Sequence, residues 1–254
     1  MSLALKRRIP FLYNFLKKYE KYIPASTELW DKKKYILNLQ IISMLNYWKH
    51  YPRLKKEAEL VYSLYEGGDF IDVGAHHGVY SFLLAPKANI DDTFVQCEPD
   101  PNAKKNLLGN LKVFKKLFSH IKLEFVFDPV SNSDSVTKHP TDYGHPVYFS
   151  KTKNNASEKS IDSVQIDELV EKLGLNPKFI KIEVEGAEYE VLQGAVNTLK
   201  NYKALIMLEK HPTLIPKNIT FDTIDNLLNK AGYEKERLVF EDDIAITEVW
   251  KNYN

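Results

Sequence analysis

Four acidic residues stand where apolar, strand-like runs of this sequence end. Asp72, Glu98, Glu183 and Glu209 each close or directly follow such a run, and His211 comes two residues after the last acid. Since the carboxyl ends of parallel strands lie along one rim of a sheet, these side chains are expected to converge. Carboxylates and an imidazole brought together in this way can bind hydroxyl groups, take protons from them, or hold a hard cation.

A glycine-containing turn follows the first of these runs. Residues 70–81, FIDVGAHHGVYS, lead from an apolar run through the turn into amphipathic sequence, which is typical of a buried parallel strand followed by a helix. Gly74 and Gly78 permit a tight turn and the close approach of a ligand. The free N–H groups at the helix start attract polar groups. Asp72 would repel a phosphate and attract an amino group or a hydroxyl.

The second acid indicates a nucleoside ligand. Glu98 lies 20 residues after Gly78, a separation at which a carboxylate accepts hydrogen bonds from both hydroxyls of a ribose. The pattern D-x-G-x-x-x-G lacks the closely spaced glycines of a pyrophosphate binder. The sequence therefore favours a nucleoside that carries a cationic amino acid over a dinucleotide, and S-adenosylmethionine (SAM) is the predicted cofactor.

Strands and helices alternate from Gly67 onward, which predicts an α/β fold with a mostly parallel sheet covered on both faces by helices. Asp100 and Asp167 are predicted to cap helices, the second of which ends at Gly174. Residues 134–160 are predicted to be loop, apart from a short strand at 146–149. The remaining strands are expected near residues 70–73, 93–97, 121–127, 179–184, 204–208, 236–240 and 244–250.

The first part of the chain differs in charge. Residues 1–66 carry 13 Lys and Arg against 6 Asp and Glu, whereas the rest carries 22 against 28. Apolar spacings of three and four predict helices over 9–22 and 29–48. We expect a basic helical extension over 1–66 and the catalytic domain over 67–254. The extension is interpreted either as a cover packed on the core or as a docking surface for a membrane, an acidic polymer or a partner enzyme, with basic residues Lys17, Lys18, Lys21 and Lys32–Lys34.

Composition narrows the class of protein. Cys97 is the single cysteine among 254 residues, so an internal disulfide is excluded. No stretch is long and apolar enough to span a membrane, and the N-terminus does not match a signal peptide. A cytoplasmic protein is expected, and no specific binding of nucleic acid.

Several motifs resemble those of FkbM-type methyltransferases. Besides residues 70–81, they are CEPDP at 97–101, VQIDEL at 164–169, IKIEVEGAEYEVLQGA at 180–195 and LEKHP at 208–212. The resemblance implies a SAM-dependent O-methyltransferase on a Rossmann-like sheet of seven strands, the last antiparallel. Members commonly methylate hydroxyls of sugars or other metabolites. Two positions depart from the family pattern, with His76 in place of Asn and Glu183 in place of Asp.

The resemblance also assigns residues to the cofactor site. Ser131 and Asn132 follow the third strand, where the adenine amino group is usually met, although an ordinary turn explains them nearly as well. The remaining cofactor-binding residues implied by the resemblance are Asp72, Gly74, Ala75, His76, Gly78 and Glu98.

Two mechanisms are open for the chemical step. An alcohol must lose a proton as it attacks a methyl group, so a general base or a metal ion must help. His211 as base, oriented by a carboxylate, is the favoured hypothesis. The alternative is a Mg²⁺-like ion held by Glu183 and Glu209. The predicted acceptor is a sugar hydroxyl, carried by a small molecule or a glycan. A free amine would not need a base or a metal ion to remove its proton.

Two other classes of protein remain as alternatives. One is a cofactor-binding protein without catalysis that docks a polymer or a partner through the basic helices. The other is a nicotinamide-dependent oxidoreductase, which would use a similar sheet but different glycine spacing.

Overall fold

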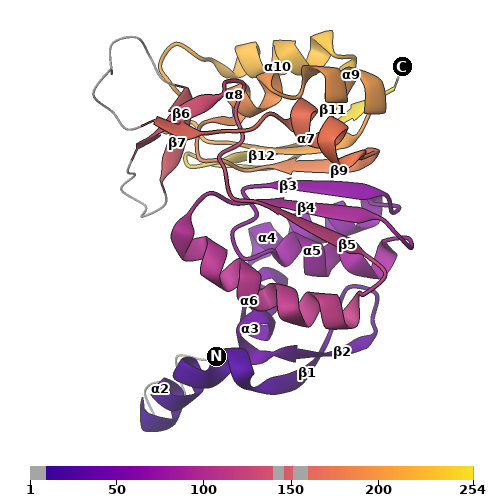
Figure 1. Cartoon of the computed structure of the whole chain (residues 1–254), viewed down its shortest axis with the longest axis vertical. Coiled ribbons are helices and arrows are strands. Elements are labelled where there is room, and N and C mark those ends of the chain that lie inside the picture. The colour runs from indigo at the N-terminus through magenta and orange to yellow at the C-terminus, as the bar shows by residue number, and fades with distance from the viewer. Residues whose placement is uncertain (1–9, 140–145, 151–159, 254) are drawn as a thin grey trace.

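The computed structural model describes residues 10–139, 146–150 and 160–253, and it contains a seven-stranded sheet (Figure 1). Six of its strands run in one direction, and the sixth in spatial order is antiparallel to both of its neighbours. This arrangement confirms the predicted Rossmann-like sheet. In spatial order the strands are β5 (Lys122–Val126), β4 (Thr93–Cys97), β3 (Asp69–Val73), β9 (Pro177–Ile182), β10 (Leu205–Lys210), β12 (Ile246–Asn252) and β11 (Tyr233–Glu241).

Helices cover both faces of the sheet, as the alternating sequence predicted (Figure 1). Successive strand residues point to opposite faces, so Ile180 joins one apolar core and Phe179 the other. The first core is covered by α7 (Ile166–Leu173), α8 (Glu188–Gln193), α9 (Val196–Tyr202) and α10 (Phe221–Lys230). The second is covered by α3 (Leu39–His50), α4 (Pro52–Leu64), α5 (Val79–Leu84), the short 3-10 helix η2 (Ala85–Lys87) and α6 (Pro101–Leu117).

The segment before α3 is only partly helical. Helix α2 (Pro10–Tyr19) and the 3-10 turn η1 (Glu20–Tyr22) agree with the predicted helix, but β1 (Pro24–Glu28) and β2 (Lys34–Asn38) form an antiparallel hairpin. The prediction of helix for residues 29–38 was therefore wrong. Leu37 is buried while its neighbour Ile36 is exposed, so the apolar residues here follow the period of a strand. Helix α3 begins only after Asn38, whose side chain accepts a hydrogen bond from the Ile41 N–H.

The hairpin and the first helices share one core with the sheet. Leu37, Ile41 and Val61 are buried in the same apolar cluster as Phe70 and Phe94 of the central strands. This part of residues 1–66 is therefore packed on the sheet. Lys32 and Lys33 are exposed in the hairpin turn rather than on a helix, and their docking role stays a prediction.

A three-stranded antiparallel sheet forms within residues 135–162. It consists of β7 (Val147–Ser150), β6 (Ser135–His139) and β8 (Ser160–Asp162) in that order. The predicted strand at 146–149 is present, but the prediction of loop was wrong for 135–139 and for Ser160, where β8 begins. The strands missed by the sequence, SVTKH and SID, each carry a single apolar residue and so show no alternation, even though Val136 and Thr137 are buried. Residues 140–145 and 151–159 of the predicted loop lie outside the described part of the chain.

Of the two predicted helix caps, one is as expected. Asp100 caps α6 and accepts a hydrogen bond from the Asn102 N–H. Asp167 lies inside α7 and instead accepts hydrogen bonds from the N–H groups of Asn197 and Thr198, at the start of α9. Asp167 therefore ties two neighbouring helices together instead of capping its own.

Candidate active site

A cavity of about 590 Å³ opens at the carboxyl ends of the central strands. Its lining includes Gly74 and Ala75 from the turn after β3, Glu98 after β4, and Glu183 after β9. Its volume is within the usual range for small-molecule and cofactor sites. Of the four acids predicted to lie along one rim, Glu98 and Glu183 therefore line the cavity, and Asp72 and Glu209 do not.

The turn after β3 requires glycine at its first bend. Gly74 has a φ of 82°, and a Cβ placed on it would lie 1.8 Å from the backbone oxygen of Glu183. Only glycine therefore lets β3 and β9 approach so closely at this point. His76 also has a positive φ, of 48°. Histidine and asparagine are both enriched in this conformation, which accounts for His76 where the family usually has Asn.

The Glu98 carboxylate is fixed by the backbone. Its two oxygens accept hydrogen bonds from the N–H groups of His76, at 2.7 Å, and Asp100, at 2.8 Å. Burial raises the pKa of Glu98, and these two N–H groups partly offset that rise. Each oxygen keeps a lone pair for a further donor. The position and the remaining acceptors fit the two hydroxyls of a ribose.

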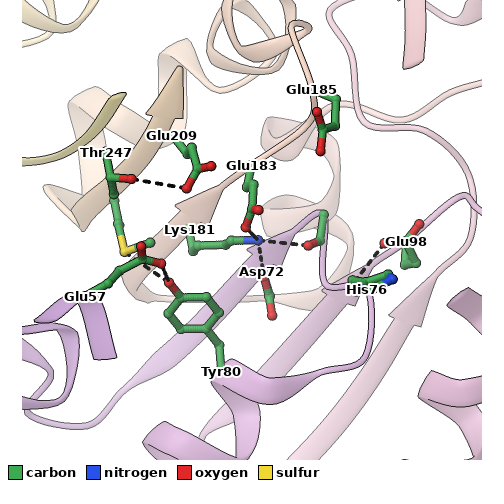
Figure 2. Close-up of polar contacts among 12 residues, drawn as sticks. Glu57, Asp72, His76, Tyr80, Glu98, Lys181, Glu183, Glu185, Glu209 and Thr247 are labelled. Carbon is green, nitrogen blue, oxygen red and sulfur yellow. Dashed lines mark hydrogen bonds and ion pairs between the residues drawn. The ribbon is translucent and has the colours of Figure 1, made fainter. Parts of the chain in front are cut away.

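A buried lysine lies at the centre of the site, as Figure 2 shows. The Lys181 ammonium is 2.8 Å from the Gly74 carbonyl oxygen and 2.8 Å from a carboxylate oxygen of Glu183. It also lies 3.4 Å from the Asp72 carboxylate, which is fully buried. Burial raises the pKa of Asp72 to about 6, against the attraction of Lys181. Lys181 therefore links the turn after β3 to Glu183, the acid that follows β9.

Glu183 is the predicted catalytic residue that lines the cavity. Its side chain is 36% exposed, and one oxygen pairs with Lys181. Burial tends to raise the pKa of Glu183, but the Lys181 charge outweighs it and the pKa lies below its usual value. Glu183 is therefore an ionised carboxylate next to the open space.

Glu209 and His211 meet, but neither belongs to the cavity lining. Glu209 forms an ion pair with Arg53 at 2.5 Å and accepts a hydrogen bond from Thr247. His211 Nε2 lies 3.5 Å from Glu209. Burial and the negative charge of Glu183 raise the pKa of Glu209, while Arg53 offsets part of the rise.

His211 is held as a cation. Its Nδ1 lies 2.8 Å from the fully buried Glu188, and its Nε2 lies 3.6 Å from Glu185. Burial would lower the pKa of His211, but Glu188, Glu185 and Glu209 together raise it to about 9. A histidine that keeps its proton at neutral pH does not fit the general base expected from the sequence, because it has no free nitrogen lone pair to accept a proton there.

The arrangement gives no support to a magnesium site. Each acid of the expected pair already has a cationic partner, Lys181 for Glu183 and Arg53 for Glu209. Within the described ranges, no cluster of three or more His, Cys, Asp or Glu side chains is arranged to hold a metal ion. The residues present therefore do not fit this alternative.

The two residues expected at the adenine point elsewhere. Ser131 Oγ hydrogen-bonds Glu190, and the Asn132 amide donates to Gln193 at 2.8 Å. The cavity wall at this place is formed by Pro129 and Val130, directly before them. The structure thus puts the chain segment at the cavity but turns these two side chains toward α8.

Sequence reasoning missed the charged residues behind the cavity. Glu57 of α4 is buried and hydrogen-bonds the Tyr80 hydroxyl, and burial raises the pKa of Glu57 to about 8. Arg53 lies one turn earlier. A signal was available for Lys181, because a lysine inside the apolar run FIKI is unusual in a buried strand. Glu57 and Arg53 gave no comparable signal, since charged residues are ordinary on a helix.

Comparisons with known proteins identify the family and the fold. A family model described as the methyltransferase FkbM domain matches residues 72–235. The hexuronic acid methyltransferase AglP of Haloferax volcanii is 28% identical over 180 residues, covering 69% of this chain and 68% of the relative.

A solved structure of a methyltransferase FkbM from Methylobacillus flagellatus KT superposes with a TM-score of 0.51 at 17% identity. The match covers 73% of this chain and 44% of that one, so the present chain spans less than half of that protein. At this identity the likeness concerns the fold.

In the part of the chain that the structure describes, no helix is long and apolar enough to cross a membrane.

Proposed function

Because this chain belongs to the FkbM methyltransferase family, we propose that it transfers a methyl group from SAM to a hydroxyl of a sugar, glycan or related metabolite. The observation that carries the proposal is that Glu98 and Glu183 line one cavity on either side of the Gly74 turn. Glu98 suits the ribose of a nucleoside, and Glu183 suits an acceptor hydroxyl. The match to a hexuronic acid methyltransferase supports a sugar as acceptor.

The cofactor turn fits SAM in shape and charge. Gly74 and Ala75 of the turn line the cavity, and the Glu98 carboxylate beside them keeps acceptors for hydroxyl groups. Gly74, Ala75, His76 and Glu98 line the cavity and would hold the cofactor, whereas Gly78 and the fully buried Asp72 lie outside the lining. The acidic surroundings favour its positive charge.

We assign the acceptance of the proton to Glu183. When bound, SAM supplies an electrophilic methyl group, which the acceptor oxygen takes while the sulfur keeps the bonding electron pair. The Glu183 carboxylate is positioned to accept the hydroxyl proton, and Lys181 keeps it ionised until then. Arg53, Glu209 and His211 lie behind it and hold its surroundings in place.

A two-step experiment tests the proposal. Calorimetric titration of the full chain with S-adenosylhomocysteine and with NAD should show binding of the first only. Release of S-adenosylhomocysteine from SAM is then measured with a panel of hexosides and oligosaccharides. Glu183→Gln should lower kcat by about 10²–10⁴-fold, because general base catalysis contributes this much, while S-adenosylhomocysteine affinity stays within a small factor of wild type.

The outcomes separate the alternatives. Binding of NAD in preference to S-adenosylhomocysteine would favour an oxidoreductase. Binding of S-adenosylhomocysteine without methyl transfer to any hydroxyl acceptor would favour a cofactor-binding protein without catalysis. Full activity of Glu183→Gln would leave methyl transfer in place and refute the role given to this residue.

A further inference from the structure

One wall of the cavity comes from a part of the chain that the family model does not match. Residues of α3 line it, together with Lys17 and Glu20 near the end of α2, whereas the match begins at residue 72. The lining residues of α3 are Gln40, Ser43, Met44, Tyr47 and Trp48. The cofactor half of the cavity is thus built by the family domain, and the other half by the preceding segment.

This wall has a rigid aromatic corner. The rings of Trp48 and Tyr80 meet edge to face, with centroids 4.9 Å apart and planes at 87°. The Tyr80 hydroxyl is held from behind by the buried Glu57. The Trp48 ring, fixed by this contact with Tyr80, offers a flat apolar surface at little cost in conformational entropy. The C–H face of a saccharide ring is a surface that matches it.

The charges of the lining oppose an anionic ligand. Lys17 is paired with Glu20 at 2.8 Å, and Lys181 is paired with Glu183 at 2.8 Å. Among the described lining residues, carboxylates outnumber these two lysines, and they are Glu20, Glu98, Asp100, Glu183 and Glu185. The wall therefore holds no excess of positive charge for a carboxylate, and like charges nearby would repel one.

We infer that α3 forms the acceptor site and that the acceptor is an uncharged saccharide. One face of the sugar lies on Trp48, with Tyr47 at the more exposed edge, and the reacting hydroxyl points toward Glu183. This inference rests on the proposed function and makes it more specific. It also separates this chain from its relative named for hexuronic acid, because the substrate named there carries a carboxylate.

The test measures binding of matched sugars to the full chain saturated with S-adenosylhomocysteine. The probes are the methyl glycosides of glucose, galactose and mannose, and the methyl glycosides of the corresponding uronic acids. Saturation-transfer NMR should show binding of at least one neutral glycoside and weaker binding of its uronate. Trp48→Leu, which keeps an apolar side chain but removes the ring, should weaken the neutral glycoside about three- to tenfold and leave S-adenosylhomocysteine affinity unchanged.

Trp30→Leu is the matched control, because Trp30 lies in the same N-terminal segment but is not part of the cavity lining. It should leave sugar binding unchanged. Tighter binding of the uronates, no binding of any neutral glycoside, or equal loss in both tryptophan variants would overturn the inference while the methyltransferase proposal stands. Failure of the wild-type chain to bind S-adenosylhomocysteine would refute the proposed function itself.

Discussion

Replacing Lys181 with methionine should move the acidic limb of the pH–rate profile to higher pH. Methionine keeps much of the apolar stem but removes the charge that lies 2.8 Å from Glu183. Glu183 must be ionised to accept a proton, so the rate depends on its pKa. Without Lys181 that pKa should rise.

The size of the shift can be worked out from the contact. Two unit charges 2.8 Å apart attract by about 6 kcal/mol at an effective dielectric constant of about 20. Since the Glu183 side chain is 36% exposed, solvent screens much of this, and we retain about 1.5–3 kcal/mol. At about 1.4 kcal/mol per pKa unit, the acidic limb should move by about 1–2 pH units. Asp72, Glu209, His211 and Arg53 remain in the variant, so the shift reports the loss of Lys181.

The assay is the initial rate of S-adenosylhomocysteine release at saturating SAM and acceptor, measured between pH 5 and 9. Lys210→Met is the matched control, because Lys210 is equally buried and paired with two acids, Asp225 and Glu248, away from the cavity. It should lose stability without moving the limb. An unchanged limb in Lys181→Met, or the same shift in Lys210→Met, would refute the reasoning.

Lys181→Met should also lose stability, and the loss should depend on pH. Asp72 is fully buried, and its folded pKa of about 6 already lies above its ordinary value of 3.8, so its ionisation opposes folding as the pH rises through this interval. Without Lys181 the folded pKa rises further. The loss of unfolding free energy relative to wild type should therefore be larger at pH 8 than at pH 5, as measured by urea denaturation.

Two further predictions concern residues on either side of the cavity. Glu98→Ala should weaken S-adenosylhomocysteine binding by about 2–4 kcal/mol, since two charge-assisted hydrogen bonds are lost; unchanged calorimetric affinity would end this assignment. The pKa of His211 is raised from 6.5 to about 9, so its contribution to stability is complete below pH 6.5 and is lost as the pH rises through 9. Wild type should therefore exceed His211→Gln by about 3 kcal/mol of unfolding free energy near pH 6, and by much less at pH 9.5; a difference independent of pH would contradict the pairing with Glu188.

The sequence by itself determined the main sheet and the glycine turn after β3. Apolar runs followed by polar turns marked six of the seven strands of the main sheet within a few residues, and the seventh, Tyr233–Glu241, was located by its central part. The glycines of the turn and the distance to Glu98 are local features, because strand, turn and helix are adjacent in the chain. Such features can be read without knowledge of distant contacts.

Hairpins and polar strands were not readable in the same way. The apolar residues of 29–38 stand next to one another without alternation, and 135–139 contains a single one, Val136, so neither pattern separates a strand from a helix or a loop. Their pairing partners and the surface that buries Leu37 and Val136 decide their conformation. Tertiary context here overrides local pattern.

The chemistry of the acids was decided by the tertiary structure. The sequence placed Glu183, Glu209 and His211 near one another, but only their neighbours give each its charge state and its access to the cavity. Lys181 keeps Glu183 ionised beside open space, Arg53 neutralises Glu209, and Glu188 holds the proton on His211. Lys181 is only two residues before Glu183, but Arg53 and Glu188 are distant in the chain from Glu209 and His211. Electrostatic interaction depends on distance in space and on burial, so these contacts follow from the tertiary structure.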